Sequence, residues 1–377
     1  MIWKLTNNKE WSALEKQFSW VADMAQVPQH KLYHAEGNVA AHTLMVLDEL
    51  QYMEDDYMSF SEQEREIIWA SALMHDIEKR STSIDEGDGI ISAAGHARRG
   101  EYTVRTILYR DLPTPFYIRE QIAALVRHHG LPIWLLEKAN PEKKVLEAAT
   151  RLNTHHLAVL AEADACGRVC VDIKDTKAMM DKIYLFREYC KEYDCWGKAR
   201  EFATPHARFH YFNTPDSYID YIPFDNFKCE VTMLSGLPGM GKDHYIQTQC
   251  KDIPVVSLDT IRRKHKIAPT DKSGNGWVVQ TAKEEARTYL RKGQNFVWNA
   301  TNITRQMRSQ LIDLFVSYGA KVKIVYIEKP YDVWRSQNKN REYPLPENVL
   351  DKLLAKLEIP LLTEAHEVEY QIVNNHQ

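Results

Sequence analysis

The stretch Val231-Thr-Met-Leu-Ser-Gly-Leu-Pro-Gly-Met-Gly-Lys242 decides the fold of the second half of this 377-residue chain. Its apolar start predicts a buried strand, and Gly236, Gly239 and Gly241 lead from that strand into a helix. In this setting the glycines let backbone N–H groups surround phosphate oxygens, and the helix N-terminus adds positive charge. Lys242 is then placed to reach the β and γ phosphates. We therefore expect a loop that binds ATP or another nucleoside triphosphate with Mg²⁺, the alternative being an ordinary glycine turn.

Position 243 departs from the usual form of this motif. It is Asp243, where a Ser or Thr hydroxyl commonly coordinates Mg²⁺. A carboxylate also binds Mg²⁺, but it places a negative charge beside the triphosphate. How the metal is held is therefore left open by the sequence.

The pattern on both sides of this loop alternates between strands and helices. Helical stretches at 280–291 and 304–317 separate short apolar runs. The runs predicted as strands are 231–235, 254–258, 295–299 and 322–327. Strands that alternate with helices predict an α/β domain with a parallel sheet covered on both faces.

Polar residues that follow two of these strands are candidates for the acceptor site. Ligands bind at the carboxyl ends of parallel strands, where Asp259 and Arg262 follow one strand and Thr301 and Asn302 another. Asp259 can accept the proton of an attacking hydroxyl, and Arg262 can hold a phosphate of the acceptor. The alternatives are that Asp259 is a helix N-cap and that Thr301 and Asn302 only form a turn.

A basic stretch near residue 340 is a candidate lid. Arg335, Lys339 and Arg341 precede two prolines, and cations that close on a nucleotide neutralise charge in the transition state. The alternative is a solvated helix face.

The order of these motifs resembles the 5′-polynucleotide kinase family of phosphate-loop phosphotransferases over about residues 230 to 377. That resemblance implies that Lys242 binds the phosphates, Asp259 is the general base and Arg262 binds the acceptor's phosphate. An arginine such as Arg341 would act from the lid. The basic run Arg262-Arg263-Lys264-His265-Lys266 favours a polyanionic acceptor.

The first 200 residues have helical periodicity throughout, which predicts an all-α bundle. Residues 201–229 lose this periodicity and are rich in proline and aromatic residues, as is typical of a connector. We therefore expect domains at 1–200 and 230–377, joined by the aromatic-rich connector 201–229.

Histidine and aspartate residues in the first half form a candidate metal site. His42 lies in a predicted helix that begins near Asn38, His75 and Asp76 end another helix, and Asp164 lies in a third. Two imidazoles and two carboxylates from three helices suit a divalent transition metal such as Mn, Ni or Co. The alternative is a packed His75 with Asp76 capping a turn.

Three further histidines can add to this site. They are candidates for a second metal or for contact with the substrate phosphate, although a surface histidine is as common: His96, His128 and His129.

The pattern His42, His75-Asp76 and Asp164 resembles the HD phosphohydrolase superfamily over about residues 30 to 170. The segments His34-Ala-Glu-Gly-Asn-Val-Ala-Ala-His-Thr and Asp164-Ala-Cys-Gly-Arg168 are most similar to the HD domain of CCA-adding enzymes. The resemblance implies metal-dependent hydrolysis of 2′,3′-cyclic, 2′- or 3′-phosphates at RNA ends, with Asp76 in the catalytic centre. Water activated by the metal would attack phosphorus.

An HD module followed by a phosphate-loop kinase resembles the bifunctional HD-Pnk enzymes of RNA end healing. The resemblance implies RNA ends as substrates, with DNA ends also open, and a separate RNA ligase that acts afterwards. A second hypothesis is an HD nucleotidase fused to a kinase for a small, nucleoside-like substrate. A third is a binding module that senses ATP without transferring its phosphate.

Composition and charge limit the remaining function classes. Residues 1–230 carry 36 acidic and 27 basic side chains, whereas residues 231–377 carry 16 and 21, so a polyanion should prefer the second half. No apolar run is long enough to cross a bilayer and the start lacks a secretory signal. Six cysteines form no CxxC pair, so we expect reduced thiols, a cytoplasmic location and no membrane partner.

Overall fold

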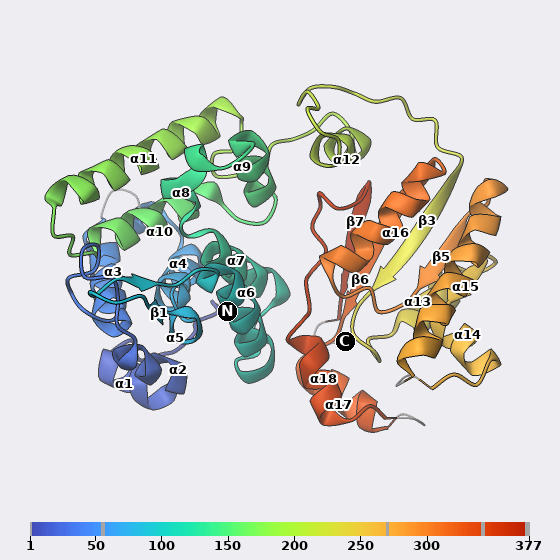
Figure 1. Cartoon of the computed structure of the whole chain (residues 1–377), viewed down its shortest axis with the longest axis horizontal. Helices are drawn as coiled ribbons and strands as arrows, with labels where there is room; N and C mark the ends of the chain where they lie inside the picture. Colours follow the sequence, from blue (N-terminus) through green and yellow to red (C-terminus); the bar gives the residue numbers. More distant parts are fainter. Residues whose placement is uncertain (1, 54–56, 269–270, 341–343, 374–377) are drawn as a thin grey trace. The chain divides into compact units, whose positions relative to one another are not determined.

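The chain divides into two units, residues 1–200 and 201–377. The computed structural model describes residues 2–53, 57–268, 271–340 and 344–373. The first unit is mostly helical and the second contains a sheet with helices (Figure 1). The predicted order, a helical half followed by an α/β half, is confirmed.

A five-stranded parallel sheet with the order β4-β5-β3-β6-β7 forms the second unit's centre. Its strands are β3 (Cys229–Ser235), β4 (Val255–Ser257), β5 (Phe296–Asn299), β6 (Ala320–Glu328) and β7 (Glu367–Ile372). The predicted parallel sheet is therefore confirmed. The edge strand β7 was not predicted, because its charged residues leave it only partly buried.

The helices of the second unit alternate with its strands along the chain, in the order expected of strand–helix repeats (Figure 1). They are α12 (Pro205–Asn213), α13 (Lys242–Gln249), α14 (Leu258–Lys264), α15 (Lys272–Arg291), α16 (Arg305–Ser317), α17 (Tyr331–Lys339) and α18 (Glu347–Leu354).

One large apolar core joins α15 and α16 to the sheet. Val278 and Ala282 of α15 and Phe315 of α16 pack with Met233 of β3 and Trp298 of β5. Period-2 alternation along the strands places these side chains on one face. The glycine loop begins directly after β3, so this packing holds the start of the loop in place.

Residues 201–229, predicted as a connector, contain α12 and belong to the second unit. Arg208 Nε donates to the Leu362 carbonyl at 3.0 Å. Asn213 Nδ2 donates to the Thr363 carbonyl at 2.9 Å. These bonds attach α12 to the segment that leads into β7.

The helices of the first unit include α4 and α10, most of whose residues are buried and which contact each other, α3 and α7. They are α1 (Trp11–Gln17), α2 (Ser19–Ala22), α3 (Val39–Tyr52), α4 (Glu62–Met74), α5 (Lys79–Thr82), α6 (His96–Thr106), α7 (Phe116–His128), α8 (Leu131–Trp134), α9 (Pro141–Ala149), α10 (Thr154–Cys166) and α11 (Ile173–Glu192). The unit departs from the all-α prediction at a two-stranded antiparallel hairpin, β1 (Ile84–Asp85) and β2 (Ile91–Ser92).

Side-chain caps define where three central helices begin. Asn38 accepts a bond from the Ala41 N–H at the start of α3, as predicted for a helix that begins near Asn38. Ser61 and Glu64 form a capping box on α4, and Asn153 caps α10. Such caps satisfy backbone donors that otherwise have no partner. They therefore fix the helix registers that place His42, His75 and Asp164.

Among the residues that the structure describes, no helix is both long enough and apolar enough to span a membrane.

Candidate metal centre and phosphate-binding loop

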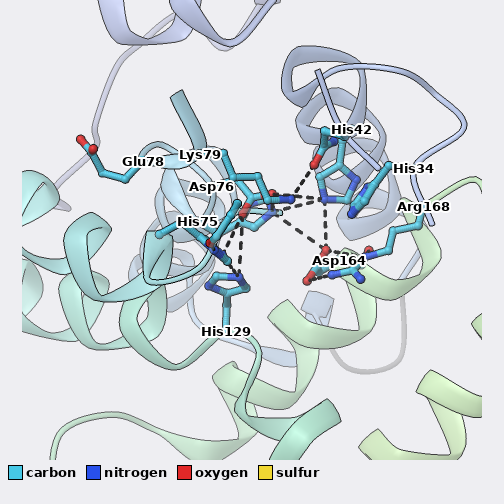
Figure 2. A network of polar contacts seen from close by, with 12 residues as sticks. His34, His42, His75, Asp76, Glu78, Lys79, His129, Asp164 and Arg168 are labelled. Atoms are coloured by element: carbon cyan, nitrogen blue, oxygen red, sulfur yellow. Dashed lines mark hydrogen bonds and ion pairs between the residues drawn. The ribbon is translucent and has the colours of Figure 1, made fainter. Parts of the chain in front are cut away.

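Four predicted metal ligands of the first unit lie together in its interior (Figure 2). His42 Nε2 lies 3.1 Å from Asp164 Oδ1 and 3.8 Å from Asp76 Oδ2. His75 Nε2 lies 3.2 Å from Asp76 Oδ2 and 4.0 Å from Asp164 Oδ1. The sequence prediction that α3, α4 and α10 bring these groups to one place agrees with this geometry.

A second group of potential ligands shares Asp76 with the first. His96 Nε2 lies 3.4 Å from Asp76 Oδ1, and His129 Nε2 lies 3.9 Å from the same oxygen. Asp76, His96 and His129 each offer one atom within the reach of a single ion, as do His42, His75 and Asp76. Asp76 therefore stands between two sets of imidazoles.

The backbone fixes which nitrogen each of these imidazoles presents. Nδ1 of His75, His96 and His129 lies 2.7, 2.7 and 2.9 Å from the carbonyl three residues earlier. Nδ1 of His42 lies 3.1 Å from the Gly167 carbonyl. A carbonyl only accepts, so each Nδ1 carries the proton and each Nε2 faces the centre.

Two pairs of these Nε2 atoms approach closely. The distance is 3.3 Å between His42 and His75 and also 3.3 Å between His96 and His129. Two nitrogen lone pairs at this separation repel unless a proton or a cation lies between them.

Asp76 supplies a second indication that cations belong here. Its Oδ1 is buried and accepts no hydrogen bond from the described residues. A buried carboxylate oxygen without a partner is costly. Imidazole nitrogens and carboxylates are the ligands that divalent transition metals prefer. The residues present therefore fit divalent metal ions, with Asp76 able to bridge two of them.

Two cations hold the carboxylates of the centre. Lys79 Nζ lies 2.7 Å from Asp76 Oδ2, and Arg168 Nη2 lies 2.6 Å from Asp164 Oδ2. Burial opposes ionisation of both carboxyls, but Lys79 and His75 outweigh it for Asp76 and hold its pKa well below the usual range. Arg168 and His42 do the same for the pKa of Asp164. Both groups are therefore anionic and suited to bind a cation.

The pKa values of two imidazoles move in opposite directions. Burial, reinforced by His96 and His75, lowers the pKa of His129 to about 3. Burial also acts on His75, but the charge of Asp76 outweighs it and raises the pKa of His75. The imidazole of His75 is therefore easier to protonate than an ordinary histidine, and that of His129 is harder to protonate.

Glu36 ties His42 to the loop before α3. Its Oε1 lies 2.7 Å from His34 Nδ1 and 3.2 Å from His42 Nδ1. Its Oε2 accepts the Val169 N–H at 3.0 Å. This carboxylate thus orients the imidazole of His42 from behind, a common arrangement around metal-ligating histidines.

His128, a candidate for the same centre, is not brought to it. Its Nε2 lies 3.4 Å from Arg151 Nη1, and burial together with Arg151 lowers its pKa well below the usual value. Consecutive residues on a helix point in different directions, so His129 reaches the centre and His128 does not.

The glycine loop of the second unit has the backbone that the motif predicts. Gly236, Gly239 and Gly241 have φ angles of 145°, 86° and 103°, which only glycine adopts readily. A Cβ at Gly236 would lie 2.5 Å from the Ile327 carbonyl oxygen. The loop therefore keeps its backbone open for a ligand's phosphates at the start of α13, which fits a nucleoside triphosphate.

Lys242 and Asp243 face different partners at the start of α13. Lys242 Nζ donates to the carbonyls of Gly236 and Leu237 at 2.9 and 3.0 Å. Asp243 Oδ1 accepts from Asn299 Nδ2 at 2.9 Å. The ammonium group thus lies over the loop, and the carboxylate is held by the neighbouring strand β5.

Asp259 and Arg262 lie together on α14. Arg262 Nη1 lies 2.6 Å from Asp259 Oδ1, and Arg262 Nε donates to Asn275 Oδ1 at 2.7 Å. The N-cap of α14 is Ser257, whose side chain accepts from the Thr260 N–H. Asp259 is therefore not the N-cap, and its largely exposed carboxylate remains available for a ligand.

Thr301 and Asn302, the other predicted acceptor residues, differ in burial and in their contacts. Asn302 is buried, and its Nδ2 donates to the Leu234 carbonyl at 2.6 Å. Thr301 is half-buried, and its carbonyl accepts the Gly236 N–H at 2.9 Å. The φ angle of Asn302 is 46°, which fits the turn role named as its alternative, and its side chain is buried against β3 and not on the acceptor surface.

The candidate lid is described only in part. Arg335 and Lys339 lie on α17, and Arg335 pairs with Glu347 and with Asp351. Arg341 lies outside the described residues.

Several residues of these sites were missed in the sequence. Lys79 and Glu36 contact the candidate metal ligands, and Asn299, at the end of β5, contacts Asp243 beside the glycine loop. For Lys79 a signal existed, since it follows Asp76 by three residues near a helix start and can therefore reach it. The contacts of Glu36 and Asn299 depend on tertiary packing.

Comparison with known families assigns each unit separately. Residues 39–168 match the HD domain model, and residues 231–360 match an AAA domain model. The first match contains His42, His75, Asp76 and Asp164, and the second contains the glycine loop, Asp259 and Arg262.

Two solved structures resemble part of the chain. One is a protein from Chloroflexus aurantiacus with a provisional kinase assignment, at 14% identity and a TM-score of 0.32, covering 39% of this chain and 86% of that one. The other is a sugar kinase from a Janibacter species, at 17% identity and a TM-score of 0.29, covering 40% of this chain and 87% of that one. TM-scores this low support no conclusion about fold or function. The family matches show that a segment similar to HD domains is followed in this chain by a segment similar to AAA domains, which contains the glycine loop.

Proposed function

We propose that this chain is a bifunctional RNA end-healing enzyme. Its HD unit removes 2′,3′-cyclic, 2′- or 3′-phosphates from RNA ends. Its second unit transfers the γ-phosphate of ATP to a 5′-hydroxyl end. The observation that carries the proposal is the presence in one chain of a group of imidazoles and carboxylates around Asp76 and of a glycine loop suited to phosphate groups.

The ligand set of the HD unit supports hydrolysis at phosphorus. Divalent ions held there supply positive charge to phosphoryl oxygens and make a water molecule more acidic. His42, His75, Asp164 and one oxygen of Asp76 would hold one ion, and His96, His129 and the other oxygen of Asp76 a second. Lys79 and Arg168 position the two aspartates.

Solvent access favours one side of this centre for the substrate. The side chain of His96 is 23% exposed, whereas that of His42 is completely buried. Arg99 follows His96 by three residues on α6 and is exposed, so both lie on one face of the helix. A phosphate that enters beside His96 would meet a cation there.

The contact between Asp259 and Arg262 supports a role of both residues in phosphate transfer. The loop N–H groups and Lys242 would hold the triphosphate. Asp259 would take the proton from the attacking 5′-hydroxyl oxygen, which forms the new bond to the γ-phosphorus as ADP leaves. Arg262, held by Asn275 and Asp259, would bind the acceptor's phosphate.

A polyanionic acceptor is favoured by the surface of α14. Arg262, Arg263 and Lys264 end this helix, with His265 and Lys266 directly after it. A nucleoside-like acceptor, the other candidate, needs no such run of cations. The healed RNA ends would pass to a separate ligase.

The proposal is tested with an RNA that bears a 5′-hydroxyl and a 3′-phosphate, supplied with ATP, Mg²⁺ and Mn²⁺, Ni²⁺ or Co²⁺. Both ends are scored for the wild-type chain and for two variants. We expect Lys242→Ala to abolish 5′-phosphorylation and to leave 3′-phosphate release intact. Asp76→Asn should do the reverse.

Two results would contradict the proposal. One is no modification of either RNA end by the wild-type chain, combined with phosphorylation of a free nucleoside. The other is loss of both activities in each variant while circular dichroism still shows a folded protein.

A further inference from the structure

The start of α13 and the end of β5 form a pair that the proposed chemistry does not yet explain. Asp243 follows Lys242 directly, and Asn299 is the last residue of β5. Asn299 Nδ2 donates to Asp243 Oδ1 at 2.9 Å, across 56 residues of chain. Asn299 is 9% exposed, so this contact connects the loop to the interior.

Sheet order explains why these two residues meet. The strands β3 and β5 are adjacent and parallel, with Leu234 opposite Asn299. The glycine loop follows β3 directly, so the carboxyl end of β5 lies beside the loop. In open α/β sheets this edge is where ligands bind.

The residue types at this pair are the reverse of the common arrangement. Phosphate-loop NTPases hold Mg²⁺ with a Ser or Thr of the loop and an Asp from a second motif. Here the loop position is Asp243, and the residue beside it at the strand end is the neutral Asn299. Each arrangement contains one carboxylate and one neutral oxygen-bearing group, so the total charge is the same.

We propose that the acidic and neutral positions have been exchanged, so that Asp243 is the protein ligand of the nucleotide's Mg²⁺ and Asn299 positions its carboxylate. Asp243 Oδ1 accepts the amide N–H, and Oδ2 keeps its lone pairs for the metal. Mg²⁺ bound to substrate phosphates commonly takes only one or two carboxylates from the protein.

A simpler role for Asp243 has to be distinguished. An acidic residue in the first turn of a helix interacts favourably with the helix dipole, and Asp243 occupies such a position in α13. Asp332 occupies the same position in α17 and is exposed. It therefore provides a matched control for charge at a helix start.

The test measures ATP affinity of the full chain as a function of free Mg²⁺, by calorimetry. The variants are Asp243→Ser, Asn299→Asp, the double variant Asp243→Ser/Asn299→Asp, and Asp332→Ser. We expect Asp243→Ser to raise the Mg²⁺ concentration for half-maximal tightening of ATP binding on the order of tenfold or more. The double variant restores the common arrangement and should return to within about threefold of wild type.

The single variant Asn299→Asp replaces the amide that contacts Asp243 with a second carboxylate. Like charges at this distance repel, so ATP without Mg²⁺ should bind more weakly than to wild type. Asp332→Ser should leave the Mg²⁺ dependence unchanged.

The inference rests on the proposed nucleotide site, and the outcomes separate the two. Failure of wild-type chain to bind ATP at any Mg²⁺ concentration contradicts the proposed function itself. If wild type binds ATP with Mg²⁺ but folded Asp243→Ser has an unchanged Mg²⁺ dependence, only the exchange is overturned. A double variant no better than Asp243→Ser overturns it as well.

Discussion

At the scale of single residues, the candidate metal centre depends on which nitrogen of each imidazole carries the proton. Three imidazoles use the same contact, Nδ1–H to the carbonyl three residues earlier. This contact fixes the tautomer and leaves Nε2 as the ligand atom. Asp76 then offers Oδ2 to His75 and Oδ1 to His96.

Asp76→Asn should remove metal from both sides of the centre. The amide keeps the size of the carboxylate but loses its charge and one acceptor oxygen. We expect 3′-phosphate release to fall on the order of 100-fold or more. Phosphate release from a 3′-phosphate RNA, with metal content measured on the same sample, checks this. Unchanged metal content would contradict a bridging role.

The side chains of this centre could be predicted from the sequence to different degrees. His42, His75, Asp76 and Asp164 were predicted because two imidazoles and two carboxylates in or at the end of three apolar helices form a pattern typical of metal ligands. His128 and His129 could not be separated, since the doublet alone does not say which one faces inward. Glu36 was missed because its partners, His42 and Val169, come together only when the loops before α3 and after α10 pack.

At the scale of elements, a close approach of α3 and α10 holds the centre together. Gly167 ends α10, and a Cβ there would lie 2.7 Å from Val46 N and 2.9 Å from Val46 Cα. The same glycine supplies the carbonyl that accepts from His42. The distance between His42 and Asp164 is thus set by the absence of a side chain at position 167.

Gly167→Ala should therefore separate α3 from α10. We expect a loss of stability of about 1–3 kcal/mol from the overlap, together with weaker metal binding. Thermal unfolding and metal titration check this. Gly130→Ala is the control, because its Cβ would make only an ordinary 3.5 Å contact with Trp134.

The stability of strands β6 and β7 should depend on pH through His366, which directly precedes β7. Burial, with His206 and Lys321 nearby, lowers the pKa of His366 to about 4. Its Nδ1 accepts the Val322 N–H at 3.0 Å, so the neutral ring is the one that fits. Between about pH 6.5 and pH 4 the unfolded chain binds this proton and the folded chain does not, so stability falls as the pH is lowered.

His366→Asn should reduce that pH dependence. One proton bound only by the unfolded chain contributes at most about 1.4 kcal/mol per pH unit. Hydrogen exchange of the β6 amides at pH 7 and pH 5 measures the difference locally. An equal loss of protection in the variant and in wild type would exclude His366 as the cause.

The element order shows where sequence patterns stop being informative. Strands β3 to β6 and helices α15 and α16 were predicted from periodicity, within a few residues except for the longer start of α15. The position of β5 between β4 and β3 was not, because pairing depends on tertiary packing. That position brings Asn299 to Asp243 and turns Asn302 toward Leu234, away from the acceptor surface.

At the scale of the whole molecule, charge is divided unequally between the halves. The excess of basic residues beyond residue 230 includes the run at the end of α14. A polyanion that contacts several of these cations releases counterions when it binds. Ionic strength therefore tests the proposed substrate class of the second unit without any mutation.

The affinity of the second unit for a 5′-hydroxyl oligonucleotide, its proposed acceptor, should fall steeply with salt. If three phosphates are contacted, the logarithm of the affinity falls with the logarithm of salt with a slope of about −2. The Michaelis constants for an oligonucleotide and for a nucleoside acceptor, measured from 50 to 200 mM salt, compare the two classes. Equal salt dependence for both acceptors would contradict a polyanion site at α14.

At the scale of the whole molecule, the proposed hydrolase activity depends on two ion sites that share Asp76. The most direct test of these sites is the number of Mn²⁺ or Co²⁺ ions bound per chain, measured by equilibrium dialysis without nucleotide and with Asp243→Ser, which removes the carboxylate proposed to hold the nucleotide's Mg²⁺. We predict two ions per chain, falling to one in His96→Ala and to fewer in Asp76→Asn. No bound ion, or a number unchanged by both substitutions, would contradict it.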